Sequence, residues 1–419
     1  MGVTRFIAWS YLPLLLVSVH PYLRIGVGST TAWWIFQGAF LIGILLLQFR
    51  LKGTGYAGQM KWIHLYLVWN LVCIARGSFV ANTYWEWKGL IGNTFGLLLP
   101  SAALIAFDLG TASALLRKAA FFTPLLFPVF FLLIPANVYG FYFAFLPLFL
   151  LMIPYLDIRW KIGLLALSLF IIMSDLGARS TAIRLSVAAT ASSWFWMRRI
   201  VPRELLEMVR KILIISPFCF LALAAWYDFN IFQMDNYVQM DASESKVTST
   251  GETVEEDLKA DTRTPLYLEV IETARKYNSW WLGRTPAKGN ETLLFAEIAR
   301  ITGSAERLSN EAAILNVFTW TGIIGVLLYC IVFYRASWLA LNDSNNYLAK
   351  ALGIFTAFRW AYSWVEEGNQ FNLSYLSIWI AIGFCSSRQF RMLSDQQISD
   401  WLRETLAPRK RHISTQETN

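Results

Sequence analysis

The chain has 419 residues, of which 56% are hydrophobic and only 15% are charged. This composition excludes an ordinary soluble domain, and the continuous rather than alternating apolar runs argue against a β-barrel. The formal net charge is +8, and most basic residues lie in short segments between the apolar runs. That distribution indicates that the basic connections set the orientation of the protein in the membrane. It gives no sign of a nucleic-acid partner. We therefore expect an all-α polytopic integral membrane protein.

The apolar runs predict about twelve transmembrane helices in two groups. Nine precede a long polar segment and three follow it. The chain is thereby divided into an N-terminal bundle (1–227), a loop (228–310), C-terminal helices (311–386) and a basic tail (387–419). Several runs are short or polar, as expected for helices that pack on one another rather than on lipid. The expected spans are 5–19, 32–48, 62–79, 90–107, 119–134, 138–155, 162–174, 181–197, 212–226, 312–334, 348–364 and 373–384.

Basic residues lie in alternate connections between these runs, at 50–61, 117–118, 159–161 and 198–211, and again in the tail. Connections of this kind stay on the cytoplasmic side of a multi-pass protein. Both termini are therefore expected to be cytoplasmic. The large loop is expected on the opposite side of the membrane.

The loop itself has two halves of different character. The first half is acidic, and its Ser- and Thr-rich stretch 243–251 is expected to be mobile, so that 241–261 forms a movable cover. In the second half, Thr264 is the predicted N-cap of an amphipathic helix that has Pro265 at its first position. A second short helix is predicted over 291–301, with Asn290 as its cap. The expected apolar face of the first helix is Leu266, Val270, Ile271, Ala274 and Tyr277.

Arginines inside or beside apolar runs are the first candidates for function, because such charges normally face a bundle interior or a water-filled cavity. Arg179 and Arg184 lie at the mouth of one predicted span, and their spacing predicts that both lie near one side of it. For Arg76 the alternative is extension of the side chain to the membrane interface. For Arg359 the alternative is a buried ion pair with Glu366.

Further cations of the loop are expected on the same side of the membrane as Arg179. Convergent guanidinium groups bind phosphate oxygens, and no glycine-rich nucleotide loop accompanies them, so a lipid phosphate is favoured over a nucleotide. The three histidines and four cysteines show no metal-ligand spacing, and neither a metal nor another cofactor is expected. These further cations are Arg263, Arg284, Lys288 and Arg307, with Arg76 as an additional contact.

Glu311 stands where the loop re-enters the membrane, directly before an apolar run. Partial desolvation at such a boundary would raise the pKa of its carboxyl group towards the range of a general base. The alternative is that Asn310 or Glu311 caps the following helix and complements its dipole. The spacing alone leaves both interpretations open.

At these residues the chain resembles the O-antigen polymerase and ligase superfamily (Wzy and WaaL type), a group of GT-C-type membrane glycan transferases. Gly177-Ala-Arg-Ser-Thr-Ala resembles its Ser-Arg-Ser/Gly signature, and Asn310-Glu311 followed by Gly322-Ile-Ile-Gly is similar to its His-Asn…Gly-x-x-Gly pattern. The large late loop, which contains Asp261-Thr-Arg263 before an amphipathic helix, is similar as well. The ligase branch usually has histidine at the position of Glu311, and this loop contains none, so the polymerase branch is favoured.

The resemblance implies an enzyme of the bacterial inner membrane with the large loop in the periplasm. It would transfer a glycan from undecaprenyl-pyrophosphate onto the terminal sugar of another lipid-linked repeat unit, without a metal. Arg179 and Arg263 would bind the pyrophosphate, Arg184 and Arg284 would support them, and Glu311 would activate or orient the acceptor. Lys288, Arg307 and Arg76 would make further substrate contacts. A chain-length regulator and a flippase of the same pathway would be further partners, beside membrane lipid.

Two other functions remain open. An O-antigen ligase would move finished polymer onto lipid A-core by the same chemistry. A transporter or flippase for the lipid-linked sugar would also use intramembrane arginines, although no internal repeat of the kind common in transporters is evident.

Overall fold

A computed structural model describes residues 2–175, 177–227, 243–247, 253–257, 263–292 and 306–406. Helices make up most of this part of the chain, and its strands are two short antiparallel pairs. Six of its helical segments are long and apolar enough to cross a membrane, or seven if one bent pair counts as a single span. The protein is therefore an all-α membrane protein.

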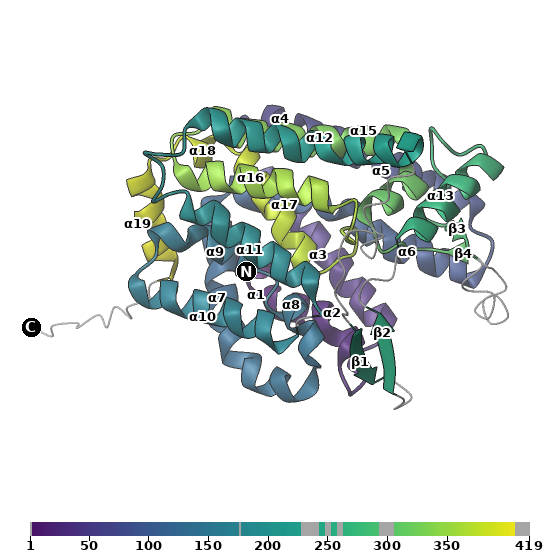
Figure 1. The fold of residues 1–419 in the computed structure, drawn as a ribbon, viewed down its shortest axis with the longest axis horizontal. Helices are drawn as coiled ribbons and strands as arrows, with labels where there is room; N and C mark the ends of the chain where they lie inside the picture. Colours follow the sequence, from purple (N-terminus) through teal and green to yellow (C-terminus); the bar gives the residue numbers. More distant parts are fainter. Residues whose placement is uncertain are drawn as a thin grey trace, which may run out of the picture.

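The N-terminal half consists of helices joined by short connections (Figure 1). Most of the expected spans appear as helices, but α10 and α11 are shorter than a typical span, and α12 starts nine residues earlier than expected. The elements are α1 (Val3–Trp9), α2 (Tyr11–Val19), η1 (His20–Tyr22), α3 (Thr30–Arg50), α4 (Tyr56–Gln59), α5 (Lys61–Val80), α6 (Tyr84–Leu98), η2 (Leu99–Phe107), α7 (Leu109–Leu133), η3 (Ala136–Val138), α8 (Tyr139–Tyr142), α9 (Leu146–Met152), η4 (Ile153–Tyr155), α10 (Ile158–Ser174), α11 (Arg179–Ser193) and α12 (Arg203–Tyr227).

The second half contains the strands and the helices that form the centre of the bundle. The elements are β1 (Ser243–Val247), β2 (Thr253–Asp257), α13 (Thr264–Lys276), β3 (Asn290–Glu291), β4 (Glu306–Arg307), α15 (Ala313–Asn342), α16 (Tyr347–Tyr362), α17 (Leu373–Ser386), α18 (Arg388–Arg391) and α19 (Asp395–Leu406).

The expected span 138–155 is not one continuous helix. It is broken between Tyr142 and Leu146, and its two halves are bent by 60°. Pro147 stands in the first turn of α9, where its missing amide hydrogen is tolerated, so a new helix starts there. The break within this expected span was not predicted from the sequence.

The loop also differs from its prediction. Arg263 rather than Thr264 is the N-cap of α13, which buries Leu266, Val270 and Ala274, whereas Ile271 and Tyr277 are exposed. Asn290 lies in β3, paired with Arg307 of β4, so it does not cap a helix at 291, and the remainder of the predicted second helix lies outside the described residues. Within the segment expected to be mobile, residues 243–247 form β1 and pair with β2.

Helices α15, α16 and α17 form the centre of the bundle. They pack on one another, α17 also packs on η2, and α16 also packs on α11 and α12 (Figure 1). Buried rings of Tyr329, Phe333, Trp360 and Trp379 lie against each other between these three helices. The chain reverses direction between consecutive helices, so one end of this unit carries the start of α15 and the connection 363–372, and the other carries the end of α15 and α18.

A break in α15 holds part of the loop against the bundle. Gly322 has φ +67° and ψ −170°, and a Cβ atom there would lie 2.2 Å from the carbonyl oxygen of Trp281. The amide of Ile323 donates to the oxygen of Trp280 at 2.8 Å, and the amide of Arg284 donates to the oxygen of Thr319 at 2.6 Å. Only glycine allows this backbone conformation and this approach without strain. The break therefore fixes segment 280–284.

Candidate functional site

One end of the central unit carries a group of charged side chains that we call the arginine–glutamate cluster. Its members come from four separate parts of the chain, namely α11, the N-terminus of α13, the segment before α15, and α16 with its following connection. Buried or half-buried charges of this kind require partners or a ligand. The cluster consists of Arg184, Arg263, Glu311, Arg359, Glu366 and Glu367.

Glu366 is the centre of the cluster and is held by two buried arginines. Its Oε2 lies 2.9 Å from Nη1 of Arg359, and its Oε1 lies 3.6 Å from Nη2 of Arg184. Burial alone would raise the pKa of Glu366, but the charges of Arg184 and Arg359 outweigh it and lower the pKa below its ordinary value. Glu366 is therefore a fixed anion, and the ion pair proposed for Arg359 from the sequence is confirmed.

Glu367, the next residue, has the opposite electrostatic environment. Burial raises its pKa to about 7, and the negative charges of Glu311 and Glu366 act in the same direction. The hydroxyl of Ser309 donates a hydrogen bond of 3.4 Å to its Oε1. Two adjacent carboxyl groups whose pKa values are shifted apart are a frequent arrangement in acid–base sites. Glu367 can therefore accept or donate a proton near neutral pH.

Arg263 and Glu311 form a hydrogen-bonded ion pair at the outer side of the cluster. The side chain of Glu311 is 60% exposed, so the desolvation expected for a base at this position is not found. The capping alternative is wrong as well, because α15 has Ala312 as its N-cap and no side-chain capping bond. Arg263, together with Arg184 and Arg359, lies within electrostatic range of the Tyr362 hydroxyl, so the pair belongs to the same site.

The connection that carries both glutamates is held by backbone contacts. The amides of Ala313 and Ile314 donate to the oxygens of Glu366 and Ser363 at 2.9 and 3.0 Å, which satisfies the first turn of α15. A Cβ atom on Gly96 would lie 1.7 Å from the oxygen of Asn369, so glycine is required for this approach of α6. The two glutamates therefore sit on a rigid support.

Several buried polar atoms near this connection have no hydrogen-bond partner within the described part of the chain. They are both amide atoms of Asn310, Oδ1 of Asn369, Oγ of Ser374 and Nε of Arg359. All four residues are at most 7% exposed. Buried polar groups are normally satisfied, so these atoms remain available for hydrogen bonds to a polar molecule. Carbohydrate hydroxyls and water would both serve.

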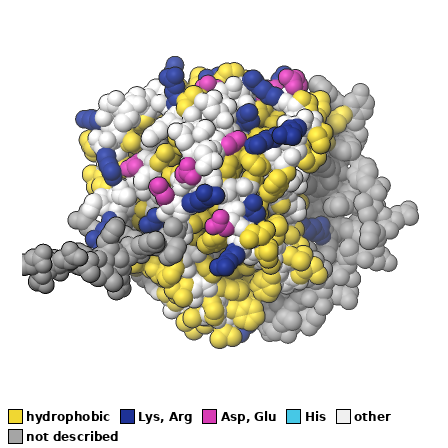
Figure 2. All heavy atoms as spheres, turned by 90° about the vertical axis from the view of Figure 1, so that its left-hand side faces the viewer, with side chains coloured by type: hydrophobic (Ala, Val, Ile, Leu, Met, Phe, Trp, Pro, Cys, Tyr) yellow, Lys and Arg dark blue, Asp and Glu magenta, His cyan; other side chains and the backbone are white. Residues whose placement is uncertain are grey.

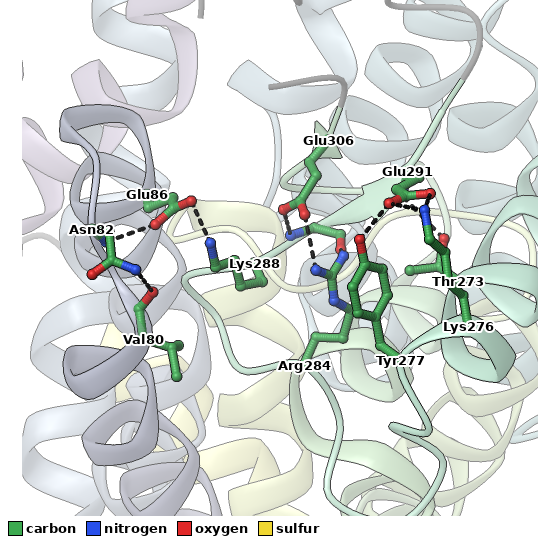
Figure 3. Close-up of polar contacts among 11 residues, drawn as sticks. Val80, Asn82, Glu86, Thr273, Lys276, Tyr277, Arg284, Lys288, Glu291 and Glu306 are labelled. Atoms are coloured by element: carbon green, nitrogen blue, oxygen red, sulfur yellow. Dashed lines mark hydrogen bonds and ion pairs between the residues drawn. The ribbon is translucent and has the colours of Figure 1, made fainter. Parts of the chain in front are cut away.

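A second group of predicted residues lies on other elements, around segment 277–289 (Figure 3). Arg76, Arg284 and Lys288 line a cavity of about 430 Å³ together with Phe79 and Tyr277. Arg284 pairs with Glu306 at 2.9 Å, and Lys288 pairs with Glu86 of α6 (Figure 3). The guanidinium of Arg284 also lies 3.9 Å from the ring centre of Tyr277. The cavity thus combines cations with two aromatic rings.

The structure changes one expectation for the arginines and adds detail for two others. Arg179 is exposed whereas Arg184 is buried, because five residues in a helix correspond to a rotation of roughly 140°, so the two do not share one side of α11. Arg76 donates hydrogen bonds to the oxygens of Leu282 and Gly283 at 2.6 and 3.3 Å. Arg307 lies in β4 with a partly buried side chain.

Sequence reasoning missed the importance of the pair Glu366-Glu367. Glu366 was considered only as a partner of Arg359, and Glu367 was not considered. A detectable signal existed, since two adjacent acids between the last two apolar runs lie on the same predicted side of the membrane as Arg184.

No model of a known protein family matches the chain, and no curated protein matches it.

Proposed function

We propose that the protein is a glycan polymerase of the O-antigen polymerase and ligase superfamily in a bacterial inner membrane. It transfers a glycan from undecaprenyl-pyrophosphate onto the terminal sugar of another lipid-linked repeat unit at the periplasmic face. The observation that carries the proposal is the arginine–glutamate cluster, which combines three arginines, paired with Glu366 and Glu311, with the neighbouring carboxyl group of Glu367, whose pKa is raised to about 7.

The proposed topology follows from the charges. About twelve membrane segments cross the bilayer, both termini are cytoplasmic and the loop 228–310 is periplasmic. In support, the arginine–glutamate cluster lies beside the start of α15, whereas basic residues such as Arg335 and Arg391 lie at or beyond its other end. The cluster is then on the side from which flipped lipid-linked sugars are reached.

The arginines divide into two roles in this proposal. Arg184 and Arg359 form ion pairs with Glu366, and this is their main role. Arg263 has a 26% exposed side chain, and Arg179 is exposed on the first turn of α11, so these two bind the pyrophosphate. Their charge stabilises the pyrophosphate as it leaves, which is the electrostatic contribution expected of such a site.

Glu367 receives the proton in the proposed reaction. The acceptor hydroxyl oxygen forms a bond to the anomeric carbon of the donor, and the bond from that carbon to the pyrophosphate oxygen breaks. The hydroxyl proton passes to the Glu367 carboxylate, and the lipid pyrophosphate leaves with the bonding electron pair. A base with a pKa near the working pH is best suited to this transfer. Glu311 orients Arg263 by its ion pair.

The cavity around Arg76, Arg284 and Lys288 binds glycan in this proposal. Its aromatic residues Tyr277 and Phe79 offer flat apolar faces of the kind on which sugar rings stack, and its cations donate hydrogen bonds. Arg307 contributes indirectly, since β4 pairs with β3 at the edge of the same segment.

The direct test is extension of lipid-linked repeat units by the purified protein in detergent. Wild type is expected to produce a ladder of longer chains. Arg179→Ala, Arg263→Ala and Glu367→Gln are expected to lose extension by 100-fold or more while their abundance in the membrane is unchanged, a loss of the size typical for general-base or charge-stabilising groups. Arg403→Ala, an exposed arginine of α19, is the matched control and keeps full activity.

The outcome also separates the other functions. Full extension by both arginine variants would contradict the site. A protein that transfers finished polymer to lipid A-core but never extends a repeat unit is a ligase. A protein that moves lipid-linked sugar across vesicles and shows no transfer in detergent is a transporter.

A further inference from the structure

The opposite end of the central unit holds a second pocket that the proposed reaction does not use. This basic pocket has a volume of about 320 Å³ and is lined from α4, α5, α15, α17 and α18. Figure 2 looks onto the end of the molecule where α18 and α19 lie, and Lys and Arg side chains are spread over it with fewer acidic ones. The polar residues that line the pocket are Gln59, Lys61, Arg335, Ser386 and Arg391.

Three cationic side chains line the basic pocket, and little negative charge balances them. Lys61 and Arg335 make no ion pair with any residue of the described ranges, and each lies beside an aromatic ring, of Trp62 and Trp338 respectively. Arg391 is paired with Asp343, but its side chain is only 3% exposed and its Nε has no partner among the described residues. Like charges that converge without an equal counter-charge repel each other unless an anion joins them.

The start of α5 adds a further positive contribution. Lys61, Trp62 and Ile63 are its first three residues and all line the pocket. The helix has 20 residues and no side-chain capping bond, so its first amide groups remain available. Helix N-termini of this kind bind phosphate and other anions.

We propose that the basic pocket binds the phosphate group of an anionic ligand, either a phospholipid headgroup or a free phosphate. Lys61 and Arg335 contact the phosphate from two sides, and Arg391 supplies a buried charge behind it. The remaining wall is apolar, with Ile63, Val332 and Leu339, which suits the glycerol and acyl part of a lipid. The proposal is independent of the glycan reaction, since the arginine–glutamate cluster lies at the other end of α15 and α16.

The test uses the full-length protein in detergent and two probes. Native mass spectrometry compares retention of phosphatidylglycerol with that of phosphatidylcholine carrying the same acyl chains. Thermal unfolding compares inorganic phosphate with chloride at equal ionic strength. Wild type is expected to prefer phosphatidylglycerol or to be stabilised by phosphate. Preference for phosphatidylglycerol without stabilisation by phosphate identifies a lipid site. Stabilisation by phosphate that also displaces the lipid identifies a site for free phosphate.

Two sets of variants make the test specific. The double variant Lys61→Gln/Arg335→Gln is expected to bind the anion about 25-fold more weakly, since each cation near a lipid surface contributes roughly a factor of five. Arg388→Gln/Arg403→Gln removes the same charge from exposed residues outside the pocket lining and is the control, expected within about twofold of wild type.

Gly58 offers a variant that leaves all three cations in place. Gly58 lines the pocket, and a Cβ atom there would meet no atom within 4 Å, so a side chain can be introduced without a clash at its Cβ. Gly58→Glu is expected to weaken binding at least about tenfold relative to Gly58→Gln, which has the same size without the charge. The proposal is overturned if wild type prefers neither anionic probe, or if the control double variant loses as much binding as Lys61→Gln/Arg335→Gln.

Discussion

The replacement Glu367→Gln gives a pH-dependent change in stability that can be worked out from the structure. The folded-state pKa is about 7 and the ordinary value is 4.5. A raised pKa means that the stabilising contribution of Glu367 is fully present below pH 4.5 and is lost as the pH rises through 7. At about 1.4 kcal/mol per pKa unit, the upper limit of the loss is about 3 kcal/mol. The glutamine side chain does not titrate, so the variant does not lose this stability as the pH rises.

The assay is thermal unfolding of both proteins in the same detergent between pH 5 and pH 9. The unfolding temperature of Glu367→Gln is expected to rise relative to wild type by several degrees, with the change between pH 5 and about 7 and a level difference at higher pH. Glu366→Gln is the internal comparison, because its pKa is lowered. The contribution of Glu366 is present above the ordinary carboxyl pKa and is lost only on acidification. Parallel curves for wild type and Glu367→Gln over the whole range would refute the reasoning.

The other predictions concern the supports of the site, and all can be measured by unfolding temperature and by extension of lipid-linked repeats. Arg359→Met is expected to destabilise the protein by at most about 3–5 kcal/mol, because it breaks a buried ion pair and leaves only Arg184, 3.6 Å away, to balance the charge of Glu366; an unchanged unfolding temperature would argue against it. Gly322→Ala is expected to lower the free energy of unfolding by at least about 1–3 kcal/mol through backbone strain, in addition to the clash with Trp281. The same variant is expected to make segment 280–284 accessible to protease. Gly96→Ala is expected to move connection 363–372 and to reduce extension more than stability, so a fully active variant would contradict this positioning role.

Hydropathy and the positions of basic residues predicted the class of protein and most of its helices, because both signals are local properties of the chain. The break at 142–146 was not predicted, since the apolar composition continues through it and only Pro147 marks the change. The strand pairing of Asn290 with Arg307 was also missed. That pairing depends on a contact across the segment 291–306, which no periodicity reveals.

The site was predicted in part. The sequence placed Arg263 and Glu311 on the same side of the membrane, and the structure joins them in an ion pair. It could not show that Arg284 and Lys288 each have a carboxylate partner, because Glu306 and Glu86 reach them only through the fold. It also could not separate the environments of Glu366 and Glu367. The folded chain brings different neighbours to each of these two adjacent residues. The composition of the sequence does not show that difference.

The break in α15 has a consequence for how the protein is assembled during synthesis. A membrane helix with unpaired amides at its middle is unfavourable in lipid, and here the amide of Ile323 is satisfied by the oxygen of Trp280. Both residues precede α16 in the chain, so the contact can form once α15 is translated, before the last helices are made. We expect segment 280–284 and α15 to insert as a single unit, and a chain cut between them to fail at membrane integration.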